Sequence, residues 1–386
     1  MLKTILKNMC LKRTKLARFS SQNTNNINNV SENSAFQTQC KPVDLSFETK
    51  KMYAAFPSIC EEIVDEQLIY HQAYPELRER YFNLLEYTVN IDQPRNIGKG
   101  IFFVHSYRML EKPSILTDDN LKKACVLGWC QRMVDVSVII DDDVFDVSDW
   151  RYNKPTWHSL KCVGQNKAIL DAAFVESSVW YLLIKQFKSH KYFPDILKQV
   201  LMSYAVTQTS QCLELTKYDV KDLDKYTYSV RGYGFAAPLL RTALYLANIE
   251  DKDAHEFSEK ITNDMSHFIK CEDDFNGVFN PMSDIQKSCT DISEGRPSWL
   301  AIQAYQKSSP AQKTILEQHY GKANKESVSK CYELFKELKL DQVFTKYREV
   351  FYNDIYLNIH KNMPKKLPKE LYLNFLNFCM TGALRV

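Results

Sequence analysis

Apolar residues recur every three or four positions along most of the chain, which is the spacing that places side chains on one face of an α-helix. Few residues interrupt this pattern, since the 386-residue chain has only 10 glycines and 13 prolines. No strand-like alternation of comparable strength competes with it. Helices are predicted over residues 62–74, 81–87, 120–140, 167–187, 195–215, 224–246, 253–269, 298–306, 326–338 and 341–359. The pattern therefore predicts an all-α fold.

Glycine, proline, asparagine and aspartate gather where the helical pattern stops, in 90–100, 147–157, 276–295 and 364–368. The sequence has no repeat of short period and no glycine-rich nucleotide-binding loop. Its apolar runs are too short to cross a membrane as a helix, which takes about 20 residues. We therefore predict one helical domain over residues 40–386 and no transmembrane segment.

Residues 1–39 do not follow the pattern of the rest of the chain. Six basic residues occur before residue 19, no acidic residue occurs before Glu32, and serine, threonine and asparagine follow. A basic, acid-free, serine-bearing and amphipathic start is typical of a mitochondrial import leader. A disordered basic tail on a cytoplasmic protein is the alternative, and both place residues 1–39 outside the fold.

The overall composition says little about partners. The net charge is +3 and 45% of the residues are apolar, so the chain can bury a sizeable core and gives no reason to expect nucleic acid as a partner. The 11 cysteines are scattered, without a CxxC pair or a zinc-type spacing. Free thiols in a reduced compartment are therefore expected.

Aspartates crowd the end of an apolar segment in SVIIDDDVFDVSDWRYNKPTWH, residues 137–158. Asp142 and Asp146 are four residues apart, so they share one face of a helix, with Asp143 beside them. Like charges placed so close are costly unless a cation relieves them. Mg²⁺ suits these carboxylates, because it prefers oxygen ligands and completes its octahedron with water and phosphate oxygens.

A second pair, Asp273 and Asp274, follows another apolar segment in HFIKCEDDFNGVF, residues 267–279. One acidic cluster alone is more often a solvated helix end. Two clusters on separate helices can face each other across a cavity and hold one diphosphate through several Mg²⁺ ions. The two motifs together therefore predict a magnesium-dependent diphosphate site.

These motifs resemble those of the short-chain trans-prenyl transferases, the farnesyl diphosphate synthase family. In that family a DDxxD motif is followed at fixed offsets by serine, arginine, proline and tryptophan, which are matched here by Ser148, Arg151, Pro155 and Trp157. The resemblance covers roughly residues 47–376. Further matching positions are Gly100, Tyr107, the LGWC stretch at 127–130, Lys287, Thr290, Asp291, Ser298 and Trp299.

The resemblance implies an all-α isoprenoid synthase bundle around a deep central cavity, working as a homodimer. It also implies about three Mg²⁺ ions, held by carboxylates of both motifs. Arg151 and Lys287 would bind the diphosphate of the substrate. The implied metal ligands and catalytic residues are Asp142, Asp143, Asp146, Asp273 and Asp274.

The chain departs from the family where a second diphosphate, that of isopentenyl diphosphate, binds a cationic patch. Asp135 puts a carboxylate where the family has a neutral polar residue, and Tyr152 replaces the second of two arginines. In the loop PRNIGKG, Asn96 stands for a lysine and Lys99 for an arginine, and the chain ends in CMTGALRV. Losing two charged hydrogen bonds costs about 3 kcal/mol, at about 1.5 kcal/mol each. Coupling to isopentenyl diphosphate is therefore predicted to be lost.

What remains is the ionisation of an allylic diphosphate. Metal ions pull off pyrophosphate, and the carbocation is captured by its own double bonds or by water. This is terpene synthase chemistry, and the chain resembles insect terpene synthases that are related to farnesyl diphosphate synthases. We therefore expect a sesquiterpene synthase that acts on farnesyl diphosphate.

Two alternatives stay open. One is a chain-lengthening farnesyl or geranylgeranyl diphosphate synthase, with a cationic patch rebuilt from Arg95, Lys99 and Arg385. The other is a non-catalytic subunit of a heteromeric prenyl synthase. The intact first motif with Arg151 and Lys287 argues against the second, because a subunit without catalytic function has no need of these residues.

Several further positions are candidates near the substrate. Ser137 and Val138 stand where the family often has aromatic residues that limit chain length, so they either deepen the cavity or reflect ordinary helix packing. The family has a Lys-Thr pair where this chain has Ser229 and Val230, so a lysine on the allylic diphosphate is lost, and Arg231 or Lys270 would compensate for it.

Two polar residues and some aromatic ones have open roles. Gly277 occupies the last aspartate position of the second motif, so Asn276 either acts as a metal ligand or marks a weakened site. Gln211 either faces the carbocation or is buried and satisfied by backbone. Tyr233, Phe235 and Phe268 either stabilise cations through their π faces or belong to the core.

Overall fold

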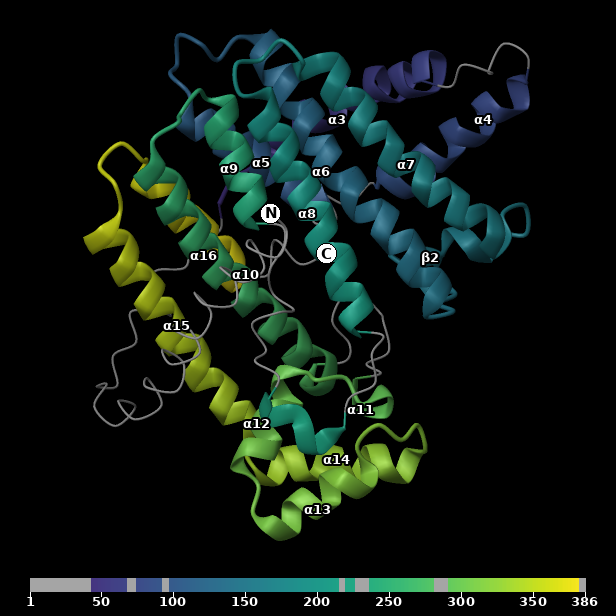
Figure 1. The fold of residues 1–386 in the computed structure, drawn as a ribbon, viewed down its shortest axis with the longest axis vertical. Helices are drawn as coiled ribbons and strands as arrows, with labels where there is room; N and C mark the ends of the chain where they lie inside the picture. The colour runs from purple at the N-terminus through teal and green to yellow at the C-terminus, as the bar shows by residue number, and fades with distance from the viewer. Residues whose placement is uncertain are drawn as a thin grey trace.

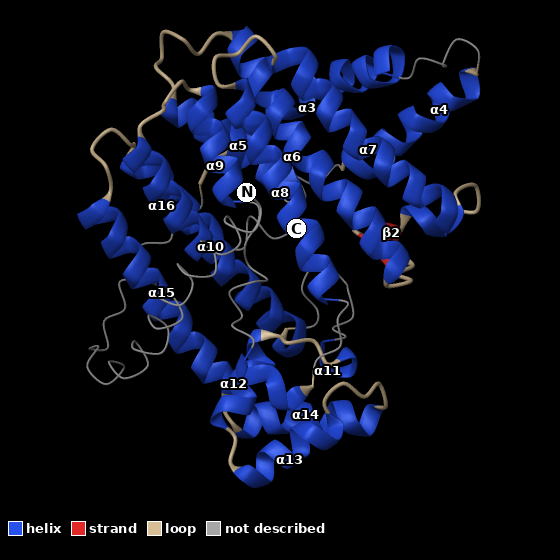
Figure 2. Ribbon diagram, viewed as in Figure 1, coloured by secondary structure: helices blue, strands red, loops and turns tan. Residues whose placement is uncertain are grey.

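The structure, a computed structural model, describes residues 43–67, 74–91, 97–214, 219–225, 236–280 and 291–381. Nearly all of this part is helical, and its two strands are 2 residues long each (Figure 2). The all-α prediction is confirmed. The predicted leader, residues 1–39, lies outside the described residues. None of the described helices is long and apolar enough to cross a membrane.

Long helices lie side by side in the larger part of the molecule, and shorter ones gather at one end of it (Figure 1). The larger part contains α3 (Ser46–Glu62), α5 (Gly98–Leu110), α6 (Asp118–Phe145), α7 (Gly164–Phe187), α8 (Phe193–Glu214), α9 (Ala236–Leu246), α10 (Lys252–Phe279), α15 (Leu340–Asn362) and α16 (Lys369–Thr381). The group at the end consists of α11 (Asp291–Glu294), α12 (Trp299–Lys307), α13 (Pro310–His319) and α14 (Lys325–Glu337).

Short elements connect these helices. The helix α4 (Pro75–Leu84) lies between two π-helical turns, η2 (Ile63–Gln67) and η3 (Leu85–Val89). A hairpin of β1 (Trp150–Arg151) and β2 (Lys154–Pro155) follows α6, and the 3₁₀ turns η5 (Trp157–Ser159) and η6 (Val220–Lys225) precede α7 and follow α8. The hairpin is important for the site, because it directly follows the first aspartate motif.

The helix α6 carries the first motif through the middle of the bundle. It starts behind Thr117, whose side chain accepts a hydrogen bond from the backbone N–H of Asn120 at 3.2 Å. Asp118 and Asp119 in its first turn are stabilised by the positive end of the helix dipole. Most of its side chains are buried, and it packs against α3, α5, α7 and α8. This burial fixes the direction in which its C-terminal end points.

Two glycines let α5 and α6 approach each other closely. A Cβ atom on Gly100 would lie 2.6 Å from the carbonyl oxygen of Gly128, and one on Gly128 would lie 2.9 Å from the carbonyl oxygen of Gly100. Both distances are shorter than atoms tolerate, so only glycine fits at the crossing. These two glycines lie in stretches that also match the family motifs, and the crossing gives a physical reason for them.

The helix α10 carries the second motif and is held by stacked aromatic rings. Phe268 stacks on Phe351 of α15 with ring centroids 4.3 Å apart, and Phe275 stacks on Phe344 of α15 at 4.2 Å. Trp299 of α12 meets the edge of Phe344 at 5.4 Å. Such pairs add about 0.5–1.5 kcal/mol each beyond the burial of their area. Phe268 is fully buried, so it belongs to the core.

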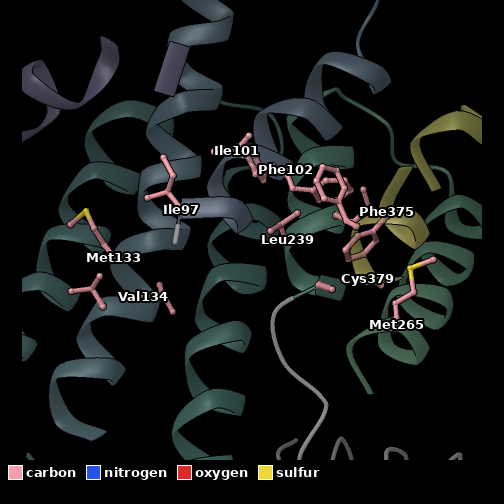
Figure 3. Packing of buried hydrophobic residues seen from close by; sticks show 14 of the residues in the cluster. Ile97, Ile101, Phe102, Met133, Val134, Leu239, Met265, Phe375 and Cys379 are labelled. Carbon is pink, nitrogen blue, oxygen red and sulfur yellow. The ribbon is translucent and has the colours of Figure 1, made fainter. Parts of the chain in front are cut away.

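The C-terminal helix α16 closes the core against α5. Phe375 of α16 stacks on Phe102 of α5 with ring centroids 4.5 Å apart, and Leu239 of α9 lies beside the pair (Figure 3). Cys379 and Met265 lie nearby and are buried (Figure 3). The described cysteines are free thiols.

Some predicted helix boundaries were wrong. The helix predicted from 120 to 140 runs on to Phe145, and the one predicted to stop at 269 runs on to Phe279, so both aspartate pairs lie inside helices. The segment predicted as one helix over 224–246 contains the 3₁₀ turn η6 and the separate helix α9, with residues 226–235 outside the description. The pattern also missed α3, α5, α13 and α16. Helix α5 lies partly in a predicted break, because its glycines serve packing rather than a turn.

Candidate active site

The first motif lies at the C-terminal end of α6. Asp142 and Asp143 belong to its last turns, and Asp146 is its C-cap, whose backbone N–H donates to the carbonyl of Asp142 at 2.8 Å. The last carbonyl groups of a helix carry partial negative charge. Carboxylates at this place are therefore unfavourable unless cations accompany them.

Arg151 supplies a cation from the hairpin that follows α6. Tyr152 and Asn153 between the strands have φ of 55° and 61°, the left-handed backbone of a two-residue type I′ turn. Thr156 donates to the carbonyl of Ser148 at 2.6 Å and ties the far side of the hairpin back to its start. The hairpin thereby places Arg151 next to the carboxylates of α6.

The guanidinium of Arg151 bridges two aspartates of the first motif. Its Nε donates to Oδ1 of Asp143 at 2.8 Å, and its Nη2 donates to Oδ2 of Asp142 at 3.0 Å. Burial would lower the pKa of Arg151, but the carboxylates of Asp143 and Asp142 raise it above its ordinary value. Arg151 was predicted to bind the substrate, and in this structure it binds the motif itself.

Arg296 supplies a second cation, which the sequence did not single out. Its Nη2 lies 3.5 Å from Oδ1 of Asp146, and its Nε lies 2.5 Å from Oε2 of Glu294. The backbone around it is fixed, since Arg296 N–H donates to the carbonyl of Asp291 at 3.0 Å and Tyr320 donates to the carbonyl of Arg296 at 2.5 Å. The signal in the sequence that could have identified Arg296 was its basic side chain between the matched positions Asp291 and Ser298.

The two aspartates of the second motif differ from each other. The side chain of Asp273 is 52% exposed, and its Oδ2 lies 3.6 Å from Nζ of Lys270. The side chain of Asp274 is buried, and its Oδ2 accepts a hydrogen bond from the backbone N–H of Trp299 at 2.8 Å. Asp274 therefore anchors the start of α12, where Ser298 is the N-cap. This anchoring role was not predicted, and the ligand role of Asp274 stays a prediction.

A short chain of contacts joins the two motifs. Asp146 of the first motif contacts Arg296, and three residues later Trp299 is bonded to Asp274 of the second motif. The segment 296–299 thus connects the end of α6 to α10. The structure links the two motifs through this segment, whose residues the prediction did not include, and the shared metal site stays a prediction.

Lys99 and Asp135 form an ion pair away from the motifs. Nζ of Lys99, in the first turn of α5, lies 2.8 Å from Oδ1 of Asp135 in the middle of α6. The two side chains are only 13% and 12% exposed. Lys99, which stands at an arginine position of the family, is therefore paired with the carboxylate that departs from the family pattern.

The family model described as polyprenyl synthetase matches residues 83–338 of the chain. The chain belongs to the polyprenyl synthetase family. A farnesyl pyrophosphate synthase of Murgantia histrionica is 30% identical over 322 residues, which cover 81% of this chain and 77% of the relative. That of Bos taurus is 30% identical over 305 residues, which cover 76% and 85%.

Solved structures agree on the fold of this member of the polyprenyl synthetase family. The Trypanosoma brucei farnesyl diphosphate synthase complexed with homorisedronate superposes with a TM-score of 0.76, covering 88% of this chain and 100% of the other. The sequence identity is 19%, so this likeness concerns the fold alone. The predicted isoprenoid synthase fold is confirmed.

The comparisons support the family and leave the finer prediction undecided. The curated relatives named above are farnesyl pyrophosphate synthases, which favours the chain-lengthening alternative more directly than the terpene synthase interpretation. A likeness at 30% identity establishes the enzyme family, in which both chemistries begin with an allylic diphosphate. The choice between them depends on the site.

The remaining candidate residues of this polyprenyl synthetase family member lie in different surroundings. Ser137 and Val138 are both buried, and the hydroxyl of Ser137 donates to the carbonyl of Val134 at 2.9 Å. Oδ1 of Asn276 accepts from the amide of Asn280 at 3.0 Å, so the oxygen needed for a metal ligand has a partner on its own helix. Lys287, Arg231, Tyr233 and Phe235, and the side chain of Gln211, lie outside the described residues.

The donor set of the two motifs fits Mg²⁺. The family depends on Mg²⁺ in general, and Asp142, Asp146 and Asp273 offer the hard oxygen ligands that this ion prefers. In this conformation no three His, Cys, Asp or Glu side chains among the described residues converge on one point. Arg151 and Arg296 instead balance the charge of the first motif. How many ions bind remains a prediction.

Titratable groups along α10 below the second motif lie in poorly solvated surroundings. Burial raises the pKa of Asp264 to about 6 and lowers the pKa of His267 to about 4. Burial also raises the pKa of Tyr347 on α15, whose hydroxyl lies 3.8 Å from Sγ of Cys271. At the other motif, burial raises the pKa of Asp141 to about 6, with the carboxylate of Glu176 adding to the effect. Burial thus favours the neutral forms of these four groups.

Proposed function

We propose that this protein ionises one allylic diphosphate, farnesyl diphosphate in the first place, and releases a cyclised or hydroxylated sesquiterpene. The observation that carries the proposal is the ion pair between Lys99 and Asp135. A second diphosphate bound without metal needs several charged donors. Lys99, which stands at one of the cationic positions, is held instead by the carboxylate of Asp135 at 2.8 Å.

The residues of the two motifs would divide the work on the first diphosphate. Bound Mg²⁺ supplies Lewis-acid stabilisation of the leaving diphosphate oxygens. Asp142, Asp146 and Asp273 would hold the ions through their carboxylate oxygens. Arg151 and Arg296, which now face these carboxylates, would donate to the diphosphate as its negative charge grows.

The fate of the carbocation follows from the absence of a second substrate. Binding of isopentenyl diphosphate at this place would require Lys99 to separate from Asp135, and breaking an ion pair that is nearly buried is costly. Without that partner, an internal double bond or a water molecule attacks the cation. The buried Ser137 and Val138 on α6 are small, which supports room for a folded C15 chain.

Chain elongation to farnesyl or geranylgeranyl diphosphate is the second candidate function. It is favoured by the relatives at 30% identity, which carry the name farnesyl pyrophosphate synthase and are covered over three quarters of their length or more. A non-catalytic subunit is disfavoured, because Arg151 and two aspartates of the first motif are kept and are bonded to each other.

A product assay separates these candidates. The purified chain is incubated with Mg²⁺ and farnesyl diphosphate alone, and in parallel with geranyl diphosphate plus isopentenyl diphosphate. The proposal predicts a volatile hydrocarbon or alcohol from the first mixture and no longer diphosphate from the second. Longer diphosphates in the second mixture and no volatiles in the first would establish chain elongation. No product in either mixture would point to the non-catalytic subunit.

We further propose a homodimer, in keeping with the family. Large apolar side chains are exposed at the end of α6 and along α7, among them Phe145, Trp150 and Leu170, which are 60%, 64% and 67% exposed. Apolar surface of this kind marks protein contacts more often than open surface. Light scattering on the purified chain measures the mass directly, and a monomer would overturn this assignment.

Import into mitochondria is proposed from the sequence of residues 1–39. A fusion of these residues to a fluorescent protein tests it. Accumulation of the fusion in mitochondria supports the proposal, and a diffuse cytoplasmic signal favours a simple basic tail.

A further inference from the structure

A small pocket lies between α6, η3 and the hairpin, on the side of α6 that carries Asp143. It is bordered by Thr88, Arg132, Tyr152, Lys154 and Arg151, among others. Asp142 and Asp146 do not border it, and neither do Lys99 and Asp135. The pocket therefore adjoins the first motif through Asp143 and Arg151, while Lys99 and Asp135 lie outside its lining. Tyr152, which stands where the family has an arginine of the cation patch, also borders it.

Arg132 is a buried charge that is mostly unpartnered. The residue is 1% exposed, and its Nη2 donates to the carbonyl of Thr88 at 3.1 Å. Its Nε and Nη1 are buried and have no hydrogen-bond partner among the described residues. No carboxylate within the described part of the chain lies at ion-pair distance from it. Buried arginines are normally paired, because an unpaired buried charge is very costly.

Two neighbours make the pocket more positive and add a donor. Lys154 also borders it, and its ammonium lies 4.0 Å from the ring centroid of Tyr87. The ammonium of Lys154 also donates to the carbonyl of Tyr87 at 2.5 Å. Burial lowers the pKa of Lys154, and the charge of Arg132 lowers it further. The hydroxyl of Tyr152 is buried without a partner in the described residues, and its ring lies 5.8 Å from the guanidinium of Arg132.

The acidic group that borders the pocket does not balance these charges. Asp143 lies on the pocket wall, but its Oδ1 is engaged by Nε of Arg151 at 2.8 Å. Unsatisfied donors and two cations thus surround the same small space. An anion with several acceptor oxygens satisfies them all, and water alone would leave the charge unbalanced.

The size of the pocket limits what can fill it. Its volume is about 30 Å³, and one water molecule needs about 10–15 Å³ on this scale. It therefore takes one compact ion and excludes an isoprenoid chain. We propose that the pocket binds a single small oxyanion of the phosphate class, held by the guanidinium of Arg132, the ammonium of Lys154 and the hydroxyl of Tyr152.

Such a site would act on the first motif through Arg151. Arg151 borders the pocket, and its guanidinium also donates to Asp142 and Asp143. An anion in the pocket draws the guanidinium towards itself and leaves the two carboxylates more negative, which favours cation binding by them. The inference does not rest on the proposed function, since a chain-lengthening enzyme with this pocket would bind the same anion.

The anion can come from free phosphate or from the end of a diphosphate, and binding experiments tell these sources apart. Isothermal titration calorimetry is done on the full chain in low-chloride buffer without Mg²⁺, which leaves the metal site empty. Inorganic phosphate, pyrophosphate and isopentenyl diphosphate are titrated separately. We expect inorganic phosphate to bind with one site per chain and a dissociation constant of about 1 mM or below.

Substitutions assign the binding to the pocket. Arg132→Met is expected to weaken phosphate binding well over tenfold, and Tyr152→Phe about tenfold, because one donor to a charged acceptor is lost. Arg78→Met is the matched control: Arg78 forms an exposed ion pair with Asp65 at 2.5 Å, away from the pocket lining, and its removal should change nothing. If Arg132→Met does not fold, Tyr152→Phe and Lys154→Met decide, since each keeps the buried guanidinium.

Each result has a defined consequence. Absence of phosphate binding to the unmodified chain at about 50 mM, far above the expected constant, overturns the inference. Binding that Arg132→Met and Tyr152→Phe leave unchanged overturns it as well. Tight binding of isopentenyl diphosphate that Arg132→Met abolishes supports the pocket and contradicts the single-substrate function, so the two proposals can fail independently.

Discussion

The two aspartate motifs have similar sequences and different surroundings. In the first, Asp142, Asp143 and Asp146 lie at a helix end and are bridged by Arg151 and Arg296. In the second, one aspartate is half exposed and the other is buried and bonded to the backbone of α12. The same residue type therefore has different roles in the two motifs. The first motif is a cluster of carboxylates paired with cations, and the second combines one candidate metal ligand with one aspartate that anchors α12.

The largest effect is expected from removing one ligand candidate of each motif. Asp142→Ala and Asp273→Ala should each lower turnover at least about 1000-fold, because about 4 kcal/mol of stabilisation of the leaving group is lost with an ion. Circular dichroism should show an unchanged fold in both. Near-normal turnover in either variant would show that the aspartate is not a ligand.

Replacing the bridging arginine should have a smaller effect. Arg151→Lys keeps the charge but cannot bond to Asp142 and Asp143 together, since lysine lacks the planar fork of arginine. We expect turnover to fall about 10- to 100-fold, corresponding to about 1.4–2.7 kcal/mol.

Arg241→Lys is the matched control, because Arg241 forms a partly exposed pair with Glu259 at 3.0 Å on other helices. Its kinetics should be those of the unmodified chain. Equal losses of turnover in both variants would mean that the effect is unspecific. Unchanged turnover in Arg151→Lys would show that the bridge between Asp142 and Asp143 is not needed for catalysis.

The contrast inside the second motif predicts that the two aspartates contribute unequally to the free energy of unfolding. Asp274→Ala leaves the buried N–H of Trp299 without an acceptor, which costs about 1–3 kcal/mol of unfolding free energy. Asp273→Ala should leave the unfolding free energy nearly unchanged, because that side chain is half exposed. The midpoints of urea unfolding measure both. Equal midpoints for the two variants would show that Asp274 is no anchor.

The smallest expected effect is on the pH dependence of stability, through Asp264 and His267 on α10. Asp264 has a pKa raised to about 6 from the ordinary 3.8, so its ionisation on going from pH 4 to 7 lowers stability. His267 has a pKa lowered to about 4 from the ordinary 6.5, so stability falls as the pH drops from about 6.5 to 4, because the unfolded chain takes up this proton first. Asp264→Asn should therefore raise stability above pH 6 by on the order of 2 kcal/mol and leave it nearly unchanged below pH 4.

Thermal unfolding at a series of pH values checks this difference. The exposed Asp273→Asn is the control and should show no such dependence. A stability gain of Asp264→Asn that is the same at pH 4 and pH 8 would contradict the shifted pKa.

Much of the fold and the location of the site could be predicted from the sequence, because both depend on local patterns. The periodicity of α6 and α10 and the two aspartate pairs are visible in single segments. The helix α5 escaped prediction because its glycines pack against α6, which is a contact between distant residues. Arg296 and the bond from Trp299 to Asp274 escaped for the same reason, since they exist only once α6, α10 and α12 have met.

The ion pair of Lys99 and Asp135 could be predicted only in part. The sequence showed a carboxylate at an unusual place and a retained lysine elsewhere, but not that they lie 2.8 Å apart. The burial of Arg132 with two unsatisfied guanidinium nitrogens was not predicted at all, because it leaves no trace in the spacing of residues.

The most direct test of the central claim is the equilibrium binding of isopentenyl diphosphate, measured for the unmodified chain and for Asp135→Gln. We predict no measurable binding at about 1 mM to the unmodified chain, and a gain of about tenfold or more when the glutamine releases Lys99, since one charge-assisted contact is restored. Micromolar binding to the unmodified chain, unaffected by Asp135→Gln, would contradict it.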